Sequence, residues 1–226
     1  MINKELQKRI LSSLIIIPIV FFFIIKGSVF FVFFLGIFLL ATAYEWLKMN
    51  KKRILKFIGI IYLVIITYLA YLLRNDLGLN IFIFVMIICI FTDIGGYIFG
   101  KILKGPKLTK ISPNKTYAGV LGSFVFPIVA CSIYAQLQSS TLFFSSYSIF
   151  DVNFFLLQYD ELKFMLIVLF ISLISQIGDL IVSYFKRLSK VKDTGNLLPG
   201  HGGLLDRVDG IIFAIPVSYL LFNYLS

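Results

Sequence analysis

The chain alternates between long apolar blocks and short segments rich in lysine and arginine. The apolar blocks are predicted to be helices, because each is close to the length of about 20 residues that a helix needs to cross a bilayer. In lipid a helix satisfies its own backbone hydrogen bonds. The pattern therefore predicts an all-α, polytopic transmembrane helix bundle of about seven spans. These spans cover Ile10–Ile25, Val29–Leu47, Ile54–Leu73, Leu79–Gly100, Ala118–Gln136, Leu162–Phe185 and Leu205–Leu225.

The first block resembles the start of a secretory signal peptide, since lysines and an arginine precede a short apolar run. No small-x-small cleavage site follows it and further spans come after, so we interpret Ile10–Ile25 as the first span. Pro18 lies within it, and Lys26-Gly27-Ser28 would form a tight turn to the second span.

The basic residues fix an orientation for the bundle. With the N-terminus in the cytoplasm, 18 of the 21 lysines and arginines fall on the cytoplasmic side, and only Lys26, Arg74 and Lys163 fall outside. Cytoplasmic loops of membrane proteins carry such an excess. The sequence thus predicts a multi-pass protein of the cell (inner) membrane with a cytoplasmic N-terminus. The outer segment Leu137–Glu161 has no basic residue and is interpreted as an interfacial connector without chemistry.

Composition agrees with this class of protein. Hydrophobic residues make up 59% of the chain and charged residues 14%, whereas soluble domains have about 45–50% apolar and about 25% charged residues. The net charge of +10 does not indicate a nucleic-acid partner, because the basic residues are distributed between spans. Cys89 and Cys131 both lie in apolar blocks without metal-type spacing, and we interpret them as small hydrophobic residues.

Two aspartates lie within or near the cytoplasmic ends of spans, namely Asp93 and Asp179. A carboxylate at the centre of a membrane helix costs about 2.5–3.5 kcal/mol and usually has a partner and a function. Gln176, Asp179, Ser183 and Lys186 are spaced so that they share one helix face. Oxygen ligands followed by a cation suit a metal-bound polyphosphate. The alternative is an aspartate near the interface that is hydrated or paired with lysine.

The segment after this helix combines basic residues, glycines and two more carboxylates. Asp206 and Asp209 are three residues apart at the start of the last span and would project together. Mg²⁺ in proteins uses one or two carboxylates plus substrate phosphate. Glycine N–H groups near a helix start can hold phosphate oxygens. The alternative for the basic run alone is an orientation signal or an anionic-lipid patch.

These residues carry a specific resemblance. The chain contains Ser183-Tyr-Phe-Lys186-Arg187, then Lys192-Asp193, then Pro199-Gly-His-Gly-Gly-Leu-Leu-Asp206-Arg-Val-Asp209. This arrangement resembles the signature of the CDP-diacylglycerol synthases (phosphatidate cytidylyltransferases).

A second segment is also similar to that family. It comprises Asp93-Ile-Gly-Gly-Tyr97 and Ser112-Pro-Asn-Lys-Thr116, although Ala118 stands where members of the family commonly have Glu or Gln. The resemblance covers residues 90–215, with cytoplasmic loops 101–117 and 186–204. Residues 1–89 would be N-terminal spans, and residues 205–226 the last span.

The resemblance implies conversion of CTP and phosphatidic acid to CDP-diacylglycerol and pyrophosphate at the cytoplasmic face. It implies Mg²⁺ with K⁺ as a second cation, and a homodimer. Catalytic roles would fall to Asp179, Lys186, Asp206 and Asp209, and metal ligation to Asp179, Ser183, Asp206 and Asp209. Substrate contacts would come from Ser112, Lys115, Thr116, Ser183, Arg187, Lys192, His201, Gly202, Gly203 and Arg207.

Some points stay open at this level. His201 either contacts a phosphate or only shapes the turn Gly200–Gly203. Gly96-x-x-x-Gly100 permits close helix approach, either inside one chain or between two copies.

Three other functions are compatible with part of the pattern. A CTP-dependent polyprenol or phytol kinase would transfer the γ-phosphate to an alcohol, but the complete ending His201-Gly-Gly-Leu-Leu-Asp206-Arg-Val-Asp209 favours the cytidylyltransferase. A cation-coupled transporter would predict repeated halves, which the sequence lacks. A purely structural membrane subunit would not need Asp179. The hypothesis requires Asp179, Asp206 and Asp209 to converge on one cation pocket at the inner edge of the membrane.

Overall fold

The structure of the protein is a computed structural model. It describes residues 4–109, 112, 115–144, 160–198, 200 and 202–225, with side chains excepted for residues 4–11 and 138–144.

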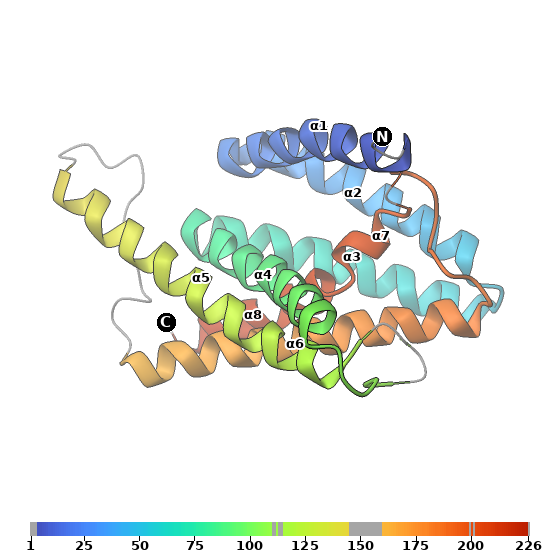
Figure 1. The fold of residues 1–226 in the computed structure, drawn as a ribbon. Helices are drawn as coiled ribbons and strands as arrows, with labels where there is room; N and C mark the ends of the chain where they lie inside the picture. The colour runs from blue at the N-terminus through green and yellow to red at the C-terminus, as the bar shows by residue number, and fades with distance from the viewer. Residues whose placement is uncertain are drawn as a thin grey trace.

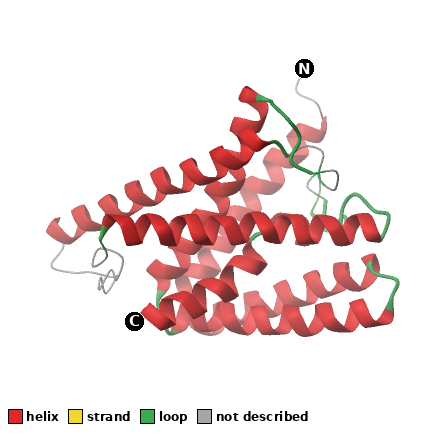
Figure 2. Cartoon of the chain, turned by 90° about the horizontal axis from the view of Figure 1, so that it is seen from below, coloured by secondary structure: helices red, strands yellow, loops and turns green. Residues whose placement is uncertain are grey.

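The described residues form helices joined by short loops (Figures 1 and 2). Five helices are long and apolar enough to cross a membrane, namely α2 to α6, with α5 counted to Leu137. Two shorter apolar stretches, Ser12–Lys26 of α1 and the whole of α8, add to them. The prediction of a polytopic membrane helix bundle is confirmed. The helices are α1 (Lys4–Lys26), α2 (Ser28–Met49), α3 (Arg53–Asn75), α4 (Leu79–Leu103), α5 (Tyr117–Phe144), α6 (Glu161–Leu188), α7 (Leu205–Val208) and α8 (Ile211–Leu225).

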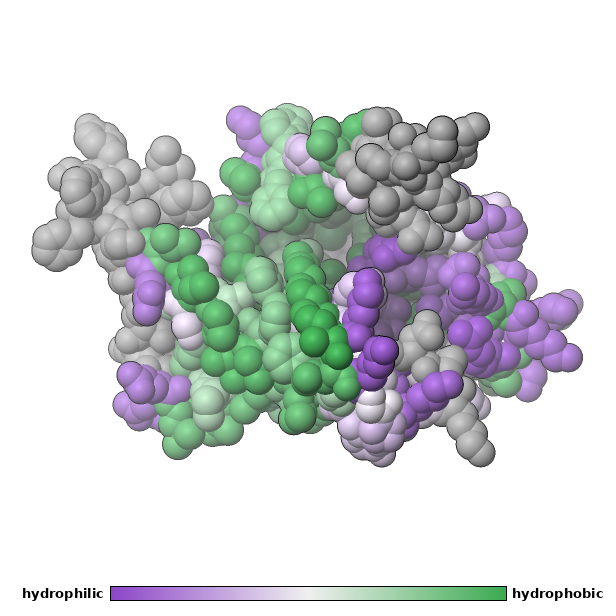
Figure 3. All heavy atoms as spheres, viewed as in Figure 1, coloured by the Kyte–Doolittle hydropathy of each residue, from purple (hydrophilic) through white to green (hydrophobic). Residues whose placement is uncertain are grey.

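Successive long helices run back and forth along one direction, so that the two ends of the chain lie at opposite ends of the bundle (Figure 1). The turn between α2 and α3, the loop before α5 and the segment after α6 therefore meet at one end. Hydrophilic residues gather at that end, and hydrophobic ones cover much of the rest of the face in view (Figure 3). Large apolar side chains such as Leu14, Val29 and Leu40 are 71%, 79% and 73% exposed, as expected of a surface that faces lipid.

The core is built from apolar side chains contributed by most of the helices. Phe31, Phe84 and Phe222 are at most 2% exposed, and the rings of Phe84 and Phe222 lie 6.3 Å apart. A second cluster surrounds Trp46, whose indole N–H donates to the carbonyl of Leu55 at 2.9 Å. This second cluster fixes the C-terminal end of α2 against α3, close to the polar end of the bundle.

Helices α4 and α5 pack with their backbones almost in contact. A Cβ atom added at Gly95 would lie 2.2 Å from the carbonyl oxygen of Gly122, and one at Gly119 would lie 2.8 Å from that of Gly96. Gly100 approaches Gly119 as well. The small-residue pattern Gly96-x-x-x-Gly100 therefore serves packing inside one chain, which was one of its two interpretations. The homodimer stays a prediction.

The prediction of one continuous last span over Leu205–Leu225 is wrong. The helix breaks after α7, at Asp209 and Gly210, and restarts as α8 at Ile211. At the break Gly210 lies against α6 so closely that a Cβ there would sit 2.4 Å from the Ser175 hydroxyl oxygen. The backbone N–H of Gly210 donates a hydrogen bond to the Asp209 carboxylate at 3.0 Å instead of to a helix carbonyl.

The fifth helix is longer than predicted. It continues beyond Gln136 to Phe144, so the first part of the expected connector Leu137–Glu161 is helical. Residues 145–159 lie outside the described residues.

Candidate active site

A cavity of about 450 Å³ opens at the polar end of the bundle, between α4, α5, α6 and the segment that leads into α7. Its volume is within the range of about 300–1,000 Å³ that is usual for ligand pockets. Most of the predicted site residues line it: Ser112, Lys115, Thr116, Asp179, Ser183, Lys186, Arg187, Lys192, Asp206, Arg207 and Asp209. Elements far apart in the sequence thus meet here, as the prediction required.

Three predicted residues are not among those that line the cavity. Gly202 and Gly203 lie in the loop that precedes α7. The N–H of Leu198 donates to the carbonyl of Gly202 at 3.0 Å. His201 lies outside the described residues, so its two interpretations stay open.

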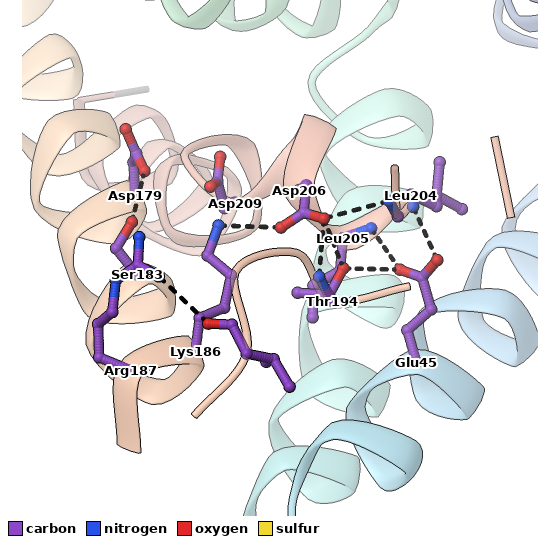
Figure 4. Close-up of polar contacts among 12 residues, drawn as sticks. Glu45, Asp179, Ser183, Lys186, Arg187, Thr194, Leu204, Leu205, Asp206 and Asp209 are labelled. Carbon is purple, nitrogen blue, oxygen red and sulfur yellow. Dashed lines mark hydrogen bonds and ion pairs between the residues drawn. The ribbon is translucent and has the colours of Figure 1, made fainter. Parts of the chain in front are cut away.

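One face of α6 presents the predicted run of polar groups. Gln176, Asp179, Ser183 and Lys186 all line the cavity, and the Ser183 hydroxyl donates to Asp179 Oδ1 at 3.3 Å (Figure 4). The helical spacing alone dictates this alignment.

The loop before α5 reaches across to this face. Lys115 Nζ forms an ion pair with Asp179 Oδ2 at 2.5 Å. Local hydrogen bonds set the position of Lys115, since Leu108 N–H donates to its carbonyl at 2.8 Å and its own N–H donates to the Ser112 carbonyl at 3.1 Å. The Thr116 hydroxyl accepts the N–H of Gly119 at 3.1 Å, as an N-capping threonine does. In this structure Thr116 therefore begins α5 as well as lining the cavity.

Asp206 is held by four donors. Its Oδ1 receives Lys186 Nζ at 2.9 Å, and the two side chains of this ion pair are 9% and 11% exposed. Its Oδ2 receives the backbone N–H of Thr194 at 2.8 Å, the Thr194 hydroxyl at 3.0 Å and the N–H of Gly203 at 3.1 Å (Figure 4). The carboxylate thus joins α6, the loop after it and the turn into α7.

Asp209 is oriented differently, although it is only one helical turn away. It is 8% exposed and lies between α7 and α8, outside the spanning helices. Burial raises the pKa of this carboxyl well above its usual range, and the charge of Asp179 raises it further, with a hydrogen bond to Asp179 adding to the effect. Asp209 and Asp179 are therefore mutually repelling carboxylates that a cation between them would stabilise.

The chemistry of these oxygen atoms suits Mg²⁺, which prefers oxygen ligands. Within the part of the chain that the structure describes, no three carboxylate, imidazole or thiol side chains are grouped closely enough to hold one metal ion. Asp179, Ser183, Asp206 and Asp209 all line the cavity. Metal ligation by these four residues stays a prediction. In this structure Lys186, Thr194 and Gly203 donate to the oxygens of Asp206. Its convergence with Asp179 and Asp209 on one ion stays a prediction.

The cavity lining contains as many cationic side chains as carboxyl groups. Five cationic side chains face five carboxylates, so an incoming polyphosphate would leave the cavity with excess negative charge. A divalent cation is the usual means of offsetting such an excess. The cations are Lys115, Lys186, Arg187, Lys192 and Arg207, and the carboxylates are Asp93, Asp179, Asp193, Asp206 and Asp209.

One buried acid next to the site was missed from the sequence. Glu45 on α2 is 1% exposed, and its carboxylate accepts hydrogen bonds from Thr194 and from the N–H groups of Leu204 and Leu205 (Figure 4). The signal was present, since Glu45 lies inside the predicted span Val29–Leu47 and a carboxylate there needs a partner as much as Asp179 does. Its partners were not predictable, because they come from the distant end of the chain.

The chain is similar in sequence to known proteins. Residues 51–225 match the model of the family described as "Cytidylyltransferase family". A protein named phosphatidate cytidylyltransferase from Staphylococcus haemolyticus (strain JCSC1435) is 38% identical over 152 residues, which are 67% of this chain and 52% of that protein. One of the same name from Bacillus subtilis (strain 168) is 37% identical over 153 residues, 67% of this chain and 51% of its own.

A third relative aligns over nearly its whole length. The phosphatidate cytidylyltransferase of Rickettsia bellii (strain RML369-C) is 33% identical over 224 residues, which are 97% of this chain and 91% of that protein. The chain spans about half the length of the Staphylococcus and Bacillus relatives. Since the family model covers most of the chain and includes the whole cavity lining, the protein belongs to the cytidylyltransferase family.

Proposed function

We propose that this membrane protein transfers a cytidylyl group from CTP to phosphatidate, giving CDP-diacylglycerol and pyrophosphate. The observation that carries the proposal is the cavity itself. It gathers lysines, arginines and carboxylates from two distant motifs at the polar end of a membrane helix bundle. Such a position lets a polar nucleotide enter from water while a lipid phosphate stays at the membrane surface. The names of the three relatives support the same reaction.

The reaction suits a site without a dedicated general base. The nucleophile would be the phosphate monoester of phosphatidate, whose second pKa is near 6, so that it is largely anionic at neutral pH. Its oxygen would attack the α-phosphorus of CTP, and the bond from that phosphorus to the bridging oxygen of the leaving pyrophosphate would break. Positioning and charge neutralisation dominate such transfers.

The cationic side chains of the lining would hold the two anions. Lys115 projects from the loop before α5, while Lys186 and Arg187 project from the end of α6. Lys192 and Arg207 flank the opening from the segment around α7. Arginine forks suit bidentate contacts to phosphate, and lysines supply compact charge. Together they would offset the charge that develops on the leaving pyrophosphate.

Mg²⁺ is the cation that we expect, with K⁺ as a second cation. Asp179, Asp209 and Ser183 would hold Mg²⁺, and the ion would neutralise phosphate charge and orient the reacting groups. Asp206 would act through Lys186 and the loop that it organises.

The proposed location is the cell (inner) membrane, with the cavity at its cytoplasmic face. The excess of basic residues at the polar end supports this orientation. CTP is made and used in the cytoplasm, so the same face gives access to the nucleotide. A homodimer is proposed only from the family resemblance.

The test is an assay of purified protein with phosphatidate, Mg²⁺ and CTP labelled in either the α- or the γ-phosphate. We expect the α-label to enter the lipid and the γ-label to appear in pyrophosphate. Asp179→Ala and Asp209→Ala should abolish both signals, whereas Asp76→Ala, which removes an exposed carboxylate outside the cavity, should leave them unchanged.

Other outcomes would identify the competing functions. Transfer of the γ-label to a lipid alcohol would indicate a CTP-dependent lipid kinase. Uptake of a solute into vesicles without any nucleotide would indicate a transporter and would refute the enzyme.

A further inference from the structure

Glu45 is a buried carboxylate that takes no direct part in the cavity. It lies in the last turns of α2 and is 1% exposed. None of the ion pairs among the described residues involves it. Its charge is instead met by hydrogen bonds from a segment about 150 residues further along the chain. A charge buried in this way is costly unless every oxygen is satisfied, so its position calls for an explanation.

The carboxylate of Glu45 accepts hydrogen bonds from both ends of the loop that leads to α7. Glu45 Oε1 accepts the N–H of Leu204 at 2.9 Å, and Oε2 accepts the N–H of Leu205 at 2.8 Å. Oε2 also lies 3.1 Å from the Thr194 hydroxyl. Because Thr194 and Leu204 flank the loop, one side chain on α2 holds both of its ends.

Thr194 links Glu45 to Asp206 in the cavity lining. Its hydroxyl lies 3.0 Å from Asp206 Oδ2 as well as 3.1 Å from Glu45 Oε2, and its backbone N–H donates to the same Asp206 oxygen at 2.8 Å. A threonine hydroxyl has one proton, so it serves the two carboxylates in turn or shares that proton between them. Asp206 in turn holds Lys186, whose ammonium group lines the cavity. Hydrogen bonds and an ion pair therefore connect Glu45 on α2 with Lys186 in the cavity lining.

Two glycines make this approach possible. A Cβ at Gly195 would lie 2.7 Å from Glu45 Oε1, and a Cβ at Gly203 would lie 2.8 Å from Glu45 Oε2 and 2.1 Å from the Thr194 hydroxyl oxygen. The loop is thus shaped to bring its backbone against this one carboxylate.

We infer that Glu45 is a positioning residue for the transfer reaction, which sets the placement of Lys186 in the cavity through Thr194 and Asp206. The inference rests on the proposed function for its effect on turnover. Glu45 precedes residue 51, where the match to the family model begins. The N-terminal helices thus contribute directly to the organisation of the site, beyond serving as membrane anchors.

The test compares Glu45→Gln with a matched variant, Thr42→Val. Thr42 is also fully buried on α2, about one turn away, but its hydroxyl donates only to Phe38 and Leu39 of its own helix. Glutamine keeps the size of Glu45 and replaces one acceptor oxygen by an NH₂ group, which would face a backbone N–H. We expect Glu45→Gln to lower kcat roughly tenfold to a hundredfold, since displacements of about 1 Å at a site have such effects. Thr42→Val should change kcat less than about twofold at equal amounts of folded protein.

A second measurement does not depend on turnover. Hydrogen exchange followed by mass spectrometry should show faster exchange in peptides covering residues 194–205 of Glu45→Gln, and unchanged exchange there in Thr42→Val. If the wild type lacked cytidylyltransferase activity but showed this difference, the proposed function would fail while the structural role of Glu45 would stand. Unchanged exchange in Glu45→Gln would refute the positioning role whatever the activity.

A double variant separates positioning from a general loss of stability. Glu45→Gln and Thr194→Val act on one network, so their combined effect on kcat should be clearly smaller than the product of the two single effects. Multiplicative effects, accompanied by equal losses of folded protein, would show that Glu45 only stabilises the bundle and would overturn the inference.

Discussion

Lys115 and Asp179 form an ion pair at 2.5 Å that joins the loop before α5 to the middle of a cavity-lining face of α6. The two residues come from the two separate motifs of the sequence. Their side chains are 27% and 23% exposed, so the pair is accessible from the cavity. An incoming phosphate or cation would compete with this contact, because phosphate attracts Lys115 and a cation attracts Asp179. Substrate or metal binding at either residue would therefore have to displace this pair.

Replacing Lys115 should separate metal binding from turnover. In Lys115→Gln the Asp179 carboxylate loses its cation while Asp209 stays nearby, so affinity for a divalent ion without substrate should rise. Turnover should fall by roughly tenfold or more, because a phosphate ligand is lost. Titration with Mn²⁺ monitored by electron paramagnetic resonance, together with the CTP assay, measures both effects. Weaker Mn²⁺ binding in Lys115→Gln would contradict the expectation.

Asp206 and Asp209 should behave differently when each is changed to asparagine. Asp209→Asn removes one of the two carboxylates available to a metal, so the Mg²⁺ concentration for half-maximal activity should rise by roughly tenfold or more. Asp206→Asn leaves the buried Lys186 without its counter-ion and should lower kcat and stability, the latter by about 3–5 kcal/mol, with little change in the Mg²⁺ requirement.

Mg²⁺ titrations of activity and thermal unfolding in detergent distinguish the two roles. An equal rise in the Mg²⁺ requirement for both variants would restore Asp206 to the metal ligands that the sequence predicted.

The glycines of the loop after α6 should not tolerate alanine. In Gly203→Ala the new methyl group would lie 2.1 Å from the Thr194 hydroxyl oxygen, so the loop must shift and activity should be largely lost. Gly36 on α2 is the control, because nothing lies within 4 Å of a Cβ there. Gly36→Ala should be neutral or stabilise by about 0.5–1 kcal/mol. The two variants are compared by kcat and by thermal unfolding, and full activity in Gly203→Ala would show that the loop is free to move.

The α4–α5 crossing should be sensitive to any added side chain. A methyl group at Gly95 would lie 2.2 Å from the carbonyl oxygen of Gly122, which is backbone and cannot rotate away. Gly95→Ala should therefore yield little folded protein in detergent, as judged by size-exclusion chromatography. Recovery equal to that of Gly36→Ala would contradict the close packing of these helices.

The orientation can be tested by labelling cysteines in intact cells with a membrane-impermeant maleimide. The native Cys89 and Cys131 are 1% and 0% exposed and should give little background. Asp76→Cys, in the turn after α3, should be labelled from outside. Lys190→Cys, in the turn after α6, should be labelled only after the membrane is permeabilised. The opposite result would place the cavity outside the cell.

Much of the fold could be predicted from the sequence alone, because in a membrane each helix is specified locally. The apolar blocks that became α2, α3, α4 and α6 were found within a few residues of their ends. Local satisfaction of backbone hydrogen bonds and the bilayer thickness are properties of a segment, so no knowledge of its neighbours is needed. The face of α6 that carries Asp179 and Ser183 followed for the same reason, from helical spacing.

Relations between distant segments could not be predicted, because they depend on which surfaces meet. The close contact of Gly210 with Ser175 on α6 depends on packing, and no local signal distinguishes Gly210 from a glycine inside a span. The contacts of Asp206 with Lys186, Thr194 and Gly203 likewise depend on tertiary packing. Glu45 was visible as a charge in a span, but only packing reveals that it holds the loop before α7.

The sequence by itself determined the membrane class, most of the helices and most of the residues that line the cavity. The tertiary structure decided which carboxylates face one another and which are occupied by lysine or by backbone N–H groups. The physical reason is that a carboxylate interacts with whichever donors lie close to it in the folded structure. For Glu45 and Asp206, helix packing decides which donors these are, because they come from other segments of the chain.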